Sequence, residues 1–409
     1  MRFPHPCFYA VLLGLWYPAA LTAAPGDLLL SIPNPDPVAG EHFGSSVAAL
    51  GPNIIVGAFG GGPSTRPYGR VLLLDGSTGD ALLKINDPNP SAGLFGWDVA
   101  AAGDNIAVTE NYAAYVFDGK TGEKLLTLPV IDAKPHIAYA GENLLVVNET
   151  APRHQLFNGT TGELIRTIQF AAPTGSEYIN SRAVTVLGDD FLVGEYLREA
   201  VVVYDSQTGD RLLTIPNPQP GTEFGHSVAA FGDDILVGAM NRAVNGIQGA
   251  GAVYLFDGQT GALKLTIPNP TPVSGEQFGI RVAGLHGHIA VALDQDRNPR
   301  SIELFDATNG AFVKAIVNPL NGAFGGGLGD ALAVVNGNLV VGAPNATFGG
   351  ASAAGAVFLF EGFPAPVPEP STASLCIVSA ICGFVFRRKN GRQVALAQLT
   401  QVHGNQLSF

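Results

Sequence analysis

The chain has 409 residues and a formal net charge of −12; 46% of its residues are hydrophobic and only 14% are charged. Acidic residues outnumber Lys and Arg by 34 to 22, which argues against a surface for nucleic acid. The apolar share is too high for a disordered chain, and glycine lacks the three-residue period of collagen. The 52 glycines and 29 prolines are instead typical of many short strands joined by turns.

The N-terminal residues 1–24 have the three parts of a secretory signal peptide. Arg2 supplies the positive charge, residues 11–17 form a short apolar stretch, and alanines up to Ala24 suit a cleavage site. The stretch is too short to span a bilayer. We therefore expect an exported protein, cleaved between Ala20 and Ala24.

One sequence unit recurs along the middle of the chain. Its anchor is an apolar strand that ends in Asp-Gly-x-Thr-Gly or a related turn, and the last copy ends without the turn. The seven anchors are Asp75, Asp118, Asn158, Asp205, Asp257, Asp306 and Glu361. Their mean spacing is about 48 residues, which matches a four-stranded blade of a β-propeller.

Each unit holds four short apolar runs, here numbered one to four in chain order. In one unit they are residues 223–232, 234–239, 251–258 and 262–270. Their Val, Ile, Leu and Phe content and their Gly, Asp or Pro boundaries predict strands. Turn acids such as Asp104 lie beside glycines at equivalent positions, so we interpret them as hairpin residues and not as catalytic carboxylates.

The offset of the repeats predicts how the fold closes. A lone run of the fourth type, residues 28–35, precedes the first unit, and the last unit, residues 324–361, has no fourth run. If the first strand completes the last sheet, the ring closes. The sequence thus predicts an all-β fold: a seven-bladed β-propeller of four-stranded blades in residues 25–362, closed by the N-terminal strand, with a signal peptide before it and a C-terminal anchor helix after it.

Two dipeptides mark the units. Phe-Gly opens run one, and Gly-Ala or a variant closes run two, as in VGAF, VGAM and VGAP. The Phe-Gly copies are Phe43-Gly44, Phe95-Gly96, Phe224-Gly225, Phe278-Gly279 and Phe324-Gly325. This pattern resembles the FG-GAP repeat in the β-propeller of integrin α chains, over roughly residues 28–361; the third unit lacks Phe-Gly. The resemblance implies the fold and says much less about function.

The resemblance also raises the question of cofactors. Integrin-type repeats often carry an Asp-rich calcium loop between runs one and two, but here that hairpin is a short turn, and calcium needs about six to eight oxygen ligands. We therefore expect neither a metal nor another cofactor. The weak alternative is a calcium site at Asp294, Asp296 and Asn298, which lie between runs two and three.

The C-terminal region resembles the PEP-CTERM sorting signal of Gram-negative bacteria. A Pro-Glu-Pro motif precedes a 14-residue apolar run, residues 373–386, and then a basic cluster; the motif and cluster residues are Pro368, Glu369, Pro370, Arg387, Arg388 and Lys389. The resemblance implies an exosortase-type partner that processes the anchor during export. We assign residues 363–370 to a linker and 371–409 to the anchor and basic tail, the only segment expected to contact the membrane. Residues 390–409 extend beyond the usual end of such a signal, which leaves cleavage open, and an ordinary C-terminal anchor is the alternative.

Two function classes remain open. The loops after runs two and four share one face and include the long segments, so we expect contacts to a ligand there; the candidates are Arg66, Tyr68, Asn241, Arg242, Asn245, Asp296 and Arg297. Tolerated insertions are the alternative. We favour a non-catalytic protein of the cell surface or extracellular matrix that binds a glycan or a protein, over a secreted hydrolase or lyase with its active site in the propeller funnel. Facing carboxylates in the channel would favour the enzyme, and an apolar channel would favour binding.

Overall fold

The computed structural model describes residues 23–60, 69–89, 93–131, 133–148, 153–169, 183–293, 301–320 and 327–363. The chain divides into a compact unit, Met1–Pro364, and a second unit, Ala365–Phe409, which lies outside the described residues. The predicted signal peptide up to residue 22 and the predicted sorting signal also lie outside them.

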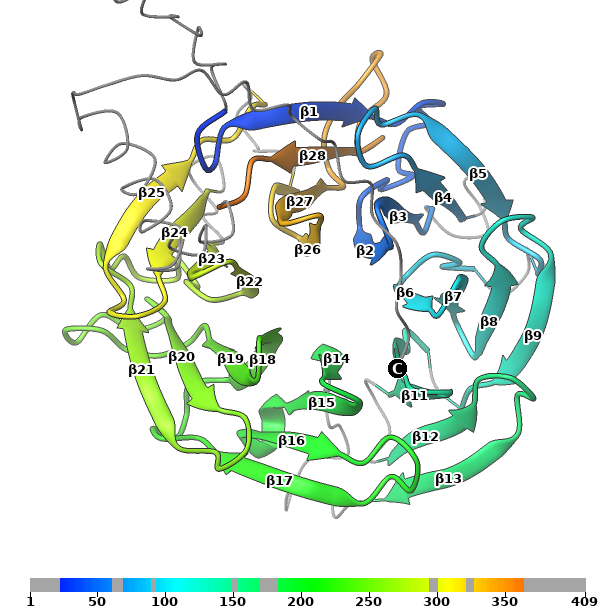
Figure 1. The fold of residues 1–409 in the computed structure, drawn as a ribbon. Coiled ribbons are helices and arrows are strands. Elements are labelled where there is room, and N and C mark those ends of the chain that lie inside the picture. Colours follow the sequence, from blue (N-terminus) through cyan, green and yellow to red (C-terminus); the bar gives the residue numbers. More distant parts are fainter. Residues whose placement is uncertain are drawn as a thin grey trace, which may run out of the picture. The chain divides into compact units, whose positions relative to one another are not determined.

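The described chain forms seven four-stranded antiparallel sheets arranged as blades around a ring (Figure 1). The strands are β2 (Ser46–Leu50), β3 (Asn53–Ala58), β4 (Arg70–Leu74) and β5 (Ala81–Asn86) in blade 1; β6 (Val99–Ala102), β7 (Asn105–Glu110), β8 (Ala113–Asp118) and β9 (Lys124–Pro129) in blade 2; β10 (His136–Ala140), β11 (Asn143–Val147), β12 (Arg153–Asn158) and β13 (Leu164–Gln169) in blade 3; β14 (Ala183–Leu187), β15 (Asp190–Glu195), β16 (Ala200–Tyr204) and β17 (Arg211–Pro216) in blade 4; β18 (Phe224–Phe231), β19 (Asp234–Ala239), β20 (Ala252–Asp257) and β21 (Leu263–Pro268) in blade 5; β22 (Arg281–Leu285), β23 (His288–Ala292), β24 (Ile302–Asp306) and β25 (Phe312–Ile316) in blade 6; and β26 (Ala331–Val335), β27 (Asn338–Ala343), β28 (Ala356–Phe360) and β1 (Leu28–Pro33) in blade 7. A short 3₁₀ turn, η1 (Tyr196–Arg198), joins β15 to β16.

The N-terminal strand closes the ring, as the offset of the repeats predicts. β1 pairs antiparallel with β28, from Leu28 opposite Phe360 to Pro33 opposite Ala356. Beyond the strand, the Gly26 N–H donates to the Glu361 carbonyl at 2.7 Å. Blade 7 is therefore built from both ends of the propeller sequence.

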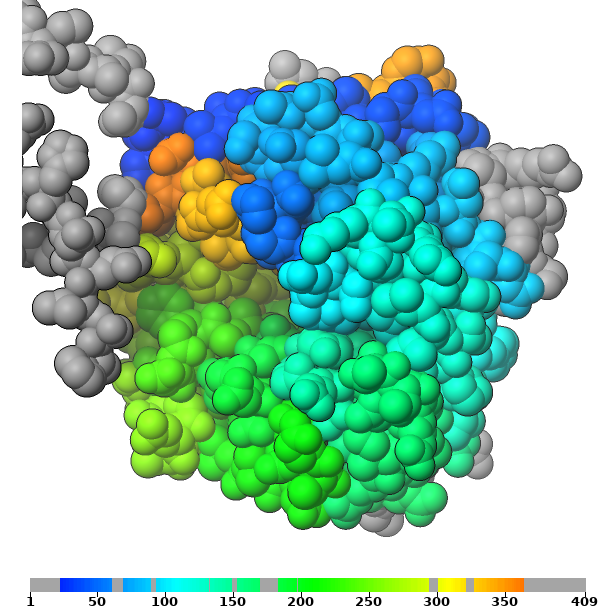
Figure 2. Space-filling model, turned by 45° about the vertical axis from the view of Figure 1, so that its right-hand side comes forward, coloured from blue at the N-terminus to red at the C-terminus, as the bar shows by residue number. Residues whose placement is uncertain are grey.

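The hydrophobic core is divided among the seven contacts between neighbouring blades. In β3, Ile54 and Val56 pack toward blade 7, while Ile55 packs toward blade 2. Because both faces of each middle strand are covered, these strands read as continuous apolar runs and not as alternating ones. Figure 2 shows the blades side by side in chain order around the ring.

The Phe-Gly and Gly-Ala motifs form two halves of one contact between blades. A Cβ on Gly57, at the end of β3, would lie 2.3 Å from the carbonyl oxygen of Gly96, and a Cβ on Gly238 would lie 2.0 Å from that of Gly279. Only glycine permits this approach. The phenylalanine before each of these carbonyls, Phe95 or Phe278, is completely buried. The repeat thus encodes blade-to-blade packing.

The seventh unit corrects one detail of the sequence reading. Gly329 has a φ of 88° and its N–H donates to the Gly342 carbonyl, as the N–H of Gly44 does to Gly57. Leu328, fully buried, takes the place of the phenylalanine. The prediction that Phe324-Gly325 opens this strand was wrong by four residues, because the leucine can fill the same apolar site.

The outermost strand of every blade is protected against pairing with another sheet edge. All seven outermost strands carry a register shift next to their first residue; in blade 1 it leaves Leu82 between the paired residues Ala81 and Leu83. Such bulges and the terminal prolines of β1, β17 and β21 both disrupt an edge. The predicted outermost position of run four is confirmed.

The residues that the sequence assigns to turns do form turns. Asp75 Oδ1 accepts the N–H groups of Ser77 and Thr78 at 2.8 and 2.9 Å, and Gly79 has a φ of 78°. These bonds, led by the one from Thr78, lower the pKa of Asp75. The hairpin glycines Gly103 and Gly232 also have positive φ, at 61° and 59°.

A recurring Asn–Glu pair ties the end of one blade to the start of the next. Asn34 and Asn269, the middle residues of Pro-Asn-Pro, are buried and donate to Glu41 and Glu276, each at 2.7 Å. Each Asn also donates to a backbone carbonyl, at 2.9 and 3.0 Å respectively. These glutamates, which precede Phe-Gly in the sequence, therefore have a structural role.

Candidate binding site at the channel mouth

A cavity of about 760 Å³ lies at the centre of the ring, where the first strands of all seven blades surround a channel (Figure 1). First strands begin on the face that carries the loops after the second and fourth strands. Phe59, Pro344 and Asn345, which follow second strands, line the same cavity. The cavity therefore reaches the face that the sequence assigns to ligand binding.

Polar side chains gather where the first strands begin. We call this region the channel mouth and define it by Ser46, Asp98, His136, Ser227, Arg281 and Asp330, all of which line the cavity. They come from six of the seven blades, and blade 4 contributes Ala183 at the corresponding place. No single repeat therefore contains the mouth, which forms only when the blades close into a ring.

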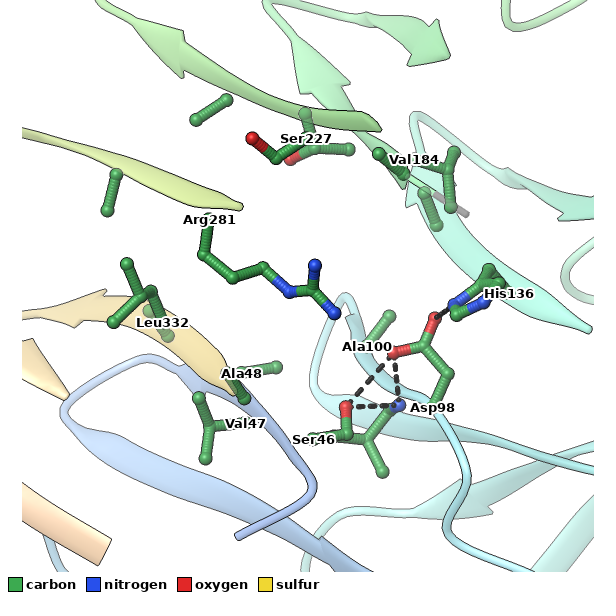
Figure 3. A pocket seen from close by; sticks show the side chains of 18 of the residues that line it. Ser46, Val47, Ala48, Asp98, Ala100, His136, Val184, Ser227, Arg281 and Leu332 are labelled. Carbon is green, nitrogen blue, oxygen red and sulfur yellow. Dashed lines mark hydrogen bonds and ion pairs between the residues drawn. The ribbon is translucent and has the colours of Figure 1, made fainter. Parts of the chain in front are cut away.

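Asp98 is the most firmly held group of the mouth (Figure 3). Its Oδ1 accepts the Ser46 hydroxyl and the Val99 N–H, both at 3.0 Å, while its Oδ2 accepts the Ile137 N–H at 3.0 Å and lies 3.3 Å from His136 Nδ1. These partners come from blades 1, 2 and 3. The carboxylate thus joins three blades, and all its acceptor directions are engaged.

Arg281 extends into the channel from the first strand of blade 6. Its Nε donates to the Asp330 carbonyl at 3.0 Å, and its Nη1 donates to the Ile280 carbonyl at 2.8 Å. Figure 3 shows its guanidinium group pointing across the channel toward Asp98. Backbone carbonyls therefore hold a cation at the mouth.

Aromatic rings form a row along one side of the mouth. His42 stacks on Phe59 with ring centroids 4.8 Å apart, Phe59 lies 5.2 Å from Trp97, and Trp97 lies 6.3 Å from His136. All four residues line the cavity. Lys134 Nζ lies 4.9 Å from the Trp97 ring centre. Blades 1 to 3 thus present a continuous aromatic surface beside the polar mouth.

Two polar atoms in this row have no hydrogen-bond partner within the described part of the chain: Trp97 Nε1 and His136 Nε2, both buried. The indole nitrogen can only donate. Asp98 as a carboxylate can only accept, so Nδ1 of His136 carries a proton in this contact, and Nε2 accepts when the ring is neutral and donates when it is charged. The two neighbouring rings therefore each have one polar atom without a partner in the described part of the chain, and buried groups of this kind normally have partners.

The comparisons with known proteins support the repeat and the fold. A model of the FG-GAP repeat matches residues 212–256, from β17 into β20. The chain contains an FG-GAP repeat. A search of the curated proteins found no match.

Solved structures match the propeller at low identity. The crystal structure of RRP9 WD40 repeats gives a TM-score of 0.59 at 12% identity and covers 83% of this chain and 99% of that one. A chain in the crystal structure of the Mitotic Checkpoint Complex gives 0.58 at 12%, covering 89% and 100%. The computationally designed Ika8 protein gives 0.51 at 13%, covering 82% and 99%. These likenesses show the fold alone.

The predicted contact residues that the structure describes lie in one loop of blade 5, outside the cavity lining. Asn241 donates to Glu223 at 2.6 Å, and Arg242 donates to Gln219 at 3.1 Å and lies 5.2 Å from the Tyr254 ring centre. Asn245 is exposed, with a φ of 52°. The other candidates, Arg66, Tyr68, Asp296 and Arg297, lie outside the described residues.

The weak calcium candidate, Asp294, Asp296 and Asn298, also lies outside the described residues. Within the described ranges, no group of three or more His, Cys, Asp or Glu side chains is placed to hold a metal ion. No helix in that part of the chain is long and apolar enough to cross a membrane.

Sequence reasoning missed the mouth residues, although the repeat contains a signal for them. Two variable positions separate Phe-Gly from a Val-Ala pair: Ser45-Ser46, Trp97-Asp98, His226-Ser227 and Ile280-Arg281. Positions that vary inside an otherwise regular repeat indicate a role beyond packing. Here they place Ser46, Asp98, Ser227 and Arg281 at the mouth.

On the same face, the buried Glu110 of blade 2 lies near the half-buried Asp87 of blade 1. Glu110, which is fully buried, accepts the Tyr115 hydroxyl. Burial, helped by the Asp87 carboxylate and opposed by the Tyr115 bond, raises the pKa of Glu110 to about 7. Glu110 is therefore largely protonated at mildly acidic pH.

We predict that the contribution of Glu110 to the free energy of unfolding falls as the pH rises from 5 to 8. An unfolded Glu110 ionises near its ordinary pKa of 4.5, whereas the folded group ionises near 7. Its stabilising contribution is therefore complete below pH 4.5 and is lost as the pH rises from 4.5 through 7. The loss can reach about 3 kcal/mol. Glu110→Gln should flatten the decline in urea titrations at several pH values. An equally steep decline in the variant would contradict the assignment.

Proposed function

We propose that the protein binds a glycan at the channel mouth without changing it chemically, and that it does so outside the producing cell. The observation that carries this proposal is the pair Trp97 Nε1 and His136 Nε2. A hydroxyl group can accept from the indole N–H, and it can donate to the imidazole nitrogen of a neutral ring or accept from that of a charged ring. A sugar presents several hydroxyls together with C–H faces that pack on aromatic rings such as those of the row.

The shape of the site favours a glycan over a protein partner. A cavity of about 760 Å³ is within the range of roughly 300–1,000 Å³ for small-molecule sites. A protein partner instead covers about 800 Å² on each side of a broad interface. The loop with Asn241, Arg242 and Asn245 lies outside the cavity lining, and we propose that it extends the binding face for a longer chain.

The charges at the mouth support binding more than hydrolysis. Asp98 and Asp330 belong to blades 2 and 7, separated by one blade, and do not face each other across the ring. The oxygens of Asp98 are occupied by four donors, so they are poorly placed to take a proton from water. Export is supported by the two terminal sequence segments and is tested by protease treatment of intact cells.

The test of this proposal is a binding assay with a panel of purified oligosaccharides and the producer's exopolysaccharide. Trp97→Phe keeps a ring and removes one donor, so we expect about threefold to tenfold weaker binding by calorimetry, and a larger loss for Trp97→Ala. Phe312→Tyr, which adds an exposed hydroxyl at the first residue of the outermost strand β25, is the matched control. Unchanged affinity in both Trp97 variants would refute the proposal, as would binding of envelope proteins alone.

A further inference from the structure

We propose that the cavity takes up the end of a glycan chain, so that the terminal sugar units lie inside it and the rest of the chain leaves through the mouth. This inference rests on the proposed function and adds the class of ligand: a chain terminus and not an internal segment. The depth of the cavity, its enclosure and the backbone groups of its wall support it.

The cavity is surrounded by the first strands of all seven blades and extends along most of their length. Its lining stops one residue before the end of every first strand; in blade 1 it includes Ser45 to Ala49, and in blade 2 Trp97 to Ala101. Five residues of strand span about 13 Å. None of the described hairpin residues that follow the first strands lines the cavity. The cavity therefore opens at the mouth, and its lining ends before the hairpin face.

The wall carries hydrogen-bonding groups along its whole depth. Each first strand is an edge of its sheet, and this edge faces the axis of the ring (Figure 1). The edge of a sheet presents backbone N–H and C=O groups that the sheet itself does not pair. Small side chains such as Ala48 and Ala100 lie beside these groups in the lining. The wall thus combines backbone donors and acceptors with C–H surface, and the hydroxyl and C–H groups of a sugar ring match both.

The enclosure favours a chain end over an internal segment. Averaged over its depth, the cavity of about 760 Å³ has a cross-section of about 60 Å², which accepts sugar units one behind the other. An internal segment would have to enter and leave through the same mouth. Sugar rings are rigid, so a chain cannot turn back within about 13 Å. A chain end, in contrast, enters without a turn and still contacts Trp97 and His136 at the mouth.

The experiment uses the producer's exopolysaccharide, sheared by sonication into fractions of different mean chain length. Calorimetry measures the binding capacity, as moles of protein bound per gram of polysaccharide. If the site binds chain ends, the capacity should double each time the mean length is halved, because the number of ends doubles at constant mass. If the site binds internal segments, every fraction should have the same capacity, and this result would overturn the inference.

A substitution inside the cavity tests the depth of entry. Thr185 lines the cavity in the first strand of blade 4, two residues below Ala183. Thr185→Tyr fills part of the space and should weaken binding of the shortest fraction at least about tenfold. Thr160→Tyr, the same change at an exposed turn position on the opposite face, is the matched control. Unchanged affinity in a Thr185→Tyr protein with the melting temperature of the parent would refute entry into the cavity.

The outcomes separate this inference from the proposed function. Equal capacity of all fractions would overturn the binding of chain ends while leaving glycan binding at the mouth in place. Absence of binding to every fraction would count against the glycan function, and the binding of chain ends would fall with it. The capacity measurement uses the unaltered chain, so it decides the question even if Thr185→Tyr destabilises the fold.

Discussion

A chain that begins at Pro35, and so lacks β1, will melt at least about 10 °C below the parent protein. The truncation removes the whole pairing with β28 and exposes the edge of blade 7. It also removes Ile32 from the core cluster between blades 7 and 1, and it breaks the bond from Lys314 to Asp27, at 2.7 Å, which joins blade 6 to the closing strand. Without closure, seven inter-blade contacts no longer support one another around the ring.

The measurement is differential scanning calorimetry of the truncated chain beside a chain that ends at Phe363 and keeps all the described strands. Adding a synthetic peptide of residues 23–36 should raise the melting temperature of the truncated chain again. A melting temperature within a few degrees of the parent would show that closure by β1 contributes little.

Arg70→Met will destabilise the protein by about 3–5 kcal/mol, because it leaves a buried carboxylate without its cation. Glu41 is fully buried and contacts Arg70 through both of its oxygens. Arg70 also donates to Asn34 at 2.7 Å. Burial raises the pKa of Glu41, and Arg70 opposes that rise. The loss should therefore be larger at pH 8 than at pH 5, where the carboxyl group can take a proton.

A double-mutant cycle tests this pair. Glu41→Leu with Arg70→Met removes both charges, and replacement of a buried pair by apolar groups is often close to neutral. The double variant should recover most of the stability that the single variant loses, as measured by urea unfolding. If Arg70→Met lowers the free energy of unfolding by less than about 1 kcal/mol, the Glu41–Arg70 pair does not stabilise the contact between blades 7 and 1 as proposed.

Much of the fold could be predicted from the sequence, because the same turn residues and inter-blade packing residues recur in most of the repeats. The Asp-Gly-x-Thr-Gly turns fixed the blade count, and the lone strand at residues 28–33 indicated the closure now seen with β28. The Leu328-Gly329 substitution escaped the prediction, since Phe-Gly in the sequence lay only four residues away. A motif search depends on residue identity, whereas the packing site accepts any apolar side chain of suitable volume.

The site was less predictable, because its members are far apart in the sequence. Asp98 contacts Ser46 and the Ile137 N–H, which are brought to it only when three blades pack together. Glu110 and Glu195 end the second strand of blades 2 and 4, where blades 1, 5 and 7 have an alanine, and each accepts a hydrogen bond from a tyrosine hydroxyl. Polar residues at these positions of an otherwise apolar strand are visible in the sequence, but the repeat pattern alone does not say what they bind.

The most direct test of a ligand site at the channel mouth is hydrogen–deuterium exchange of the propeller with and without the glycan that binds best in the panel. We expect protection in peptides covering residues 42–49, 93–101 and 133–138, which come from three blades and meet at the mouth. Protection at residues 241–245 as well would show that the outer loop extends the site. Protection confined to the opposite face, at hairpins such as residues 103–105 and 232–234, would contradict the proposed site.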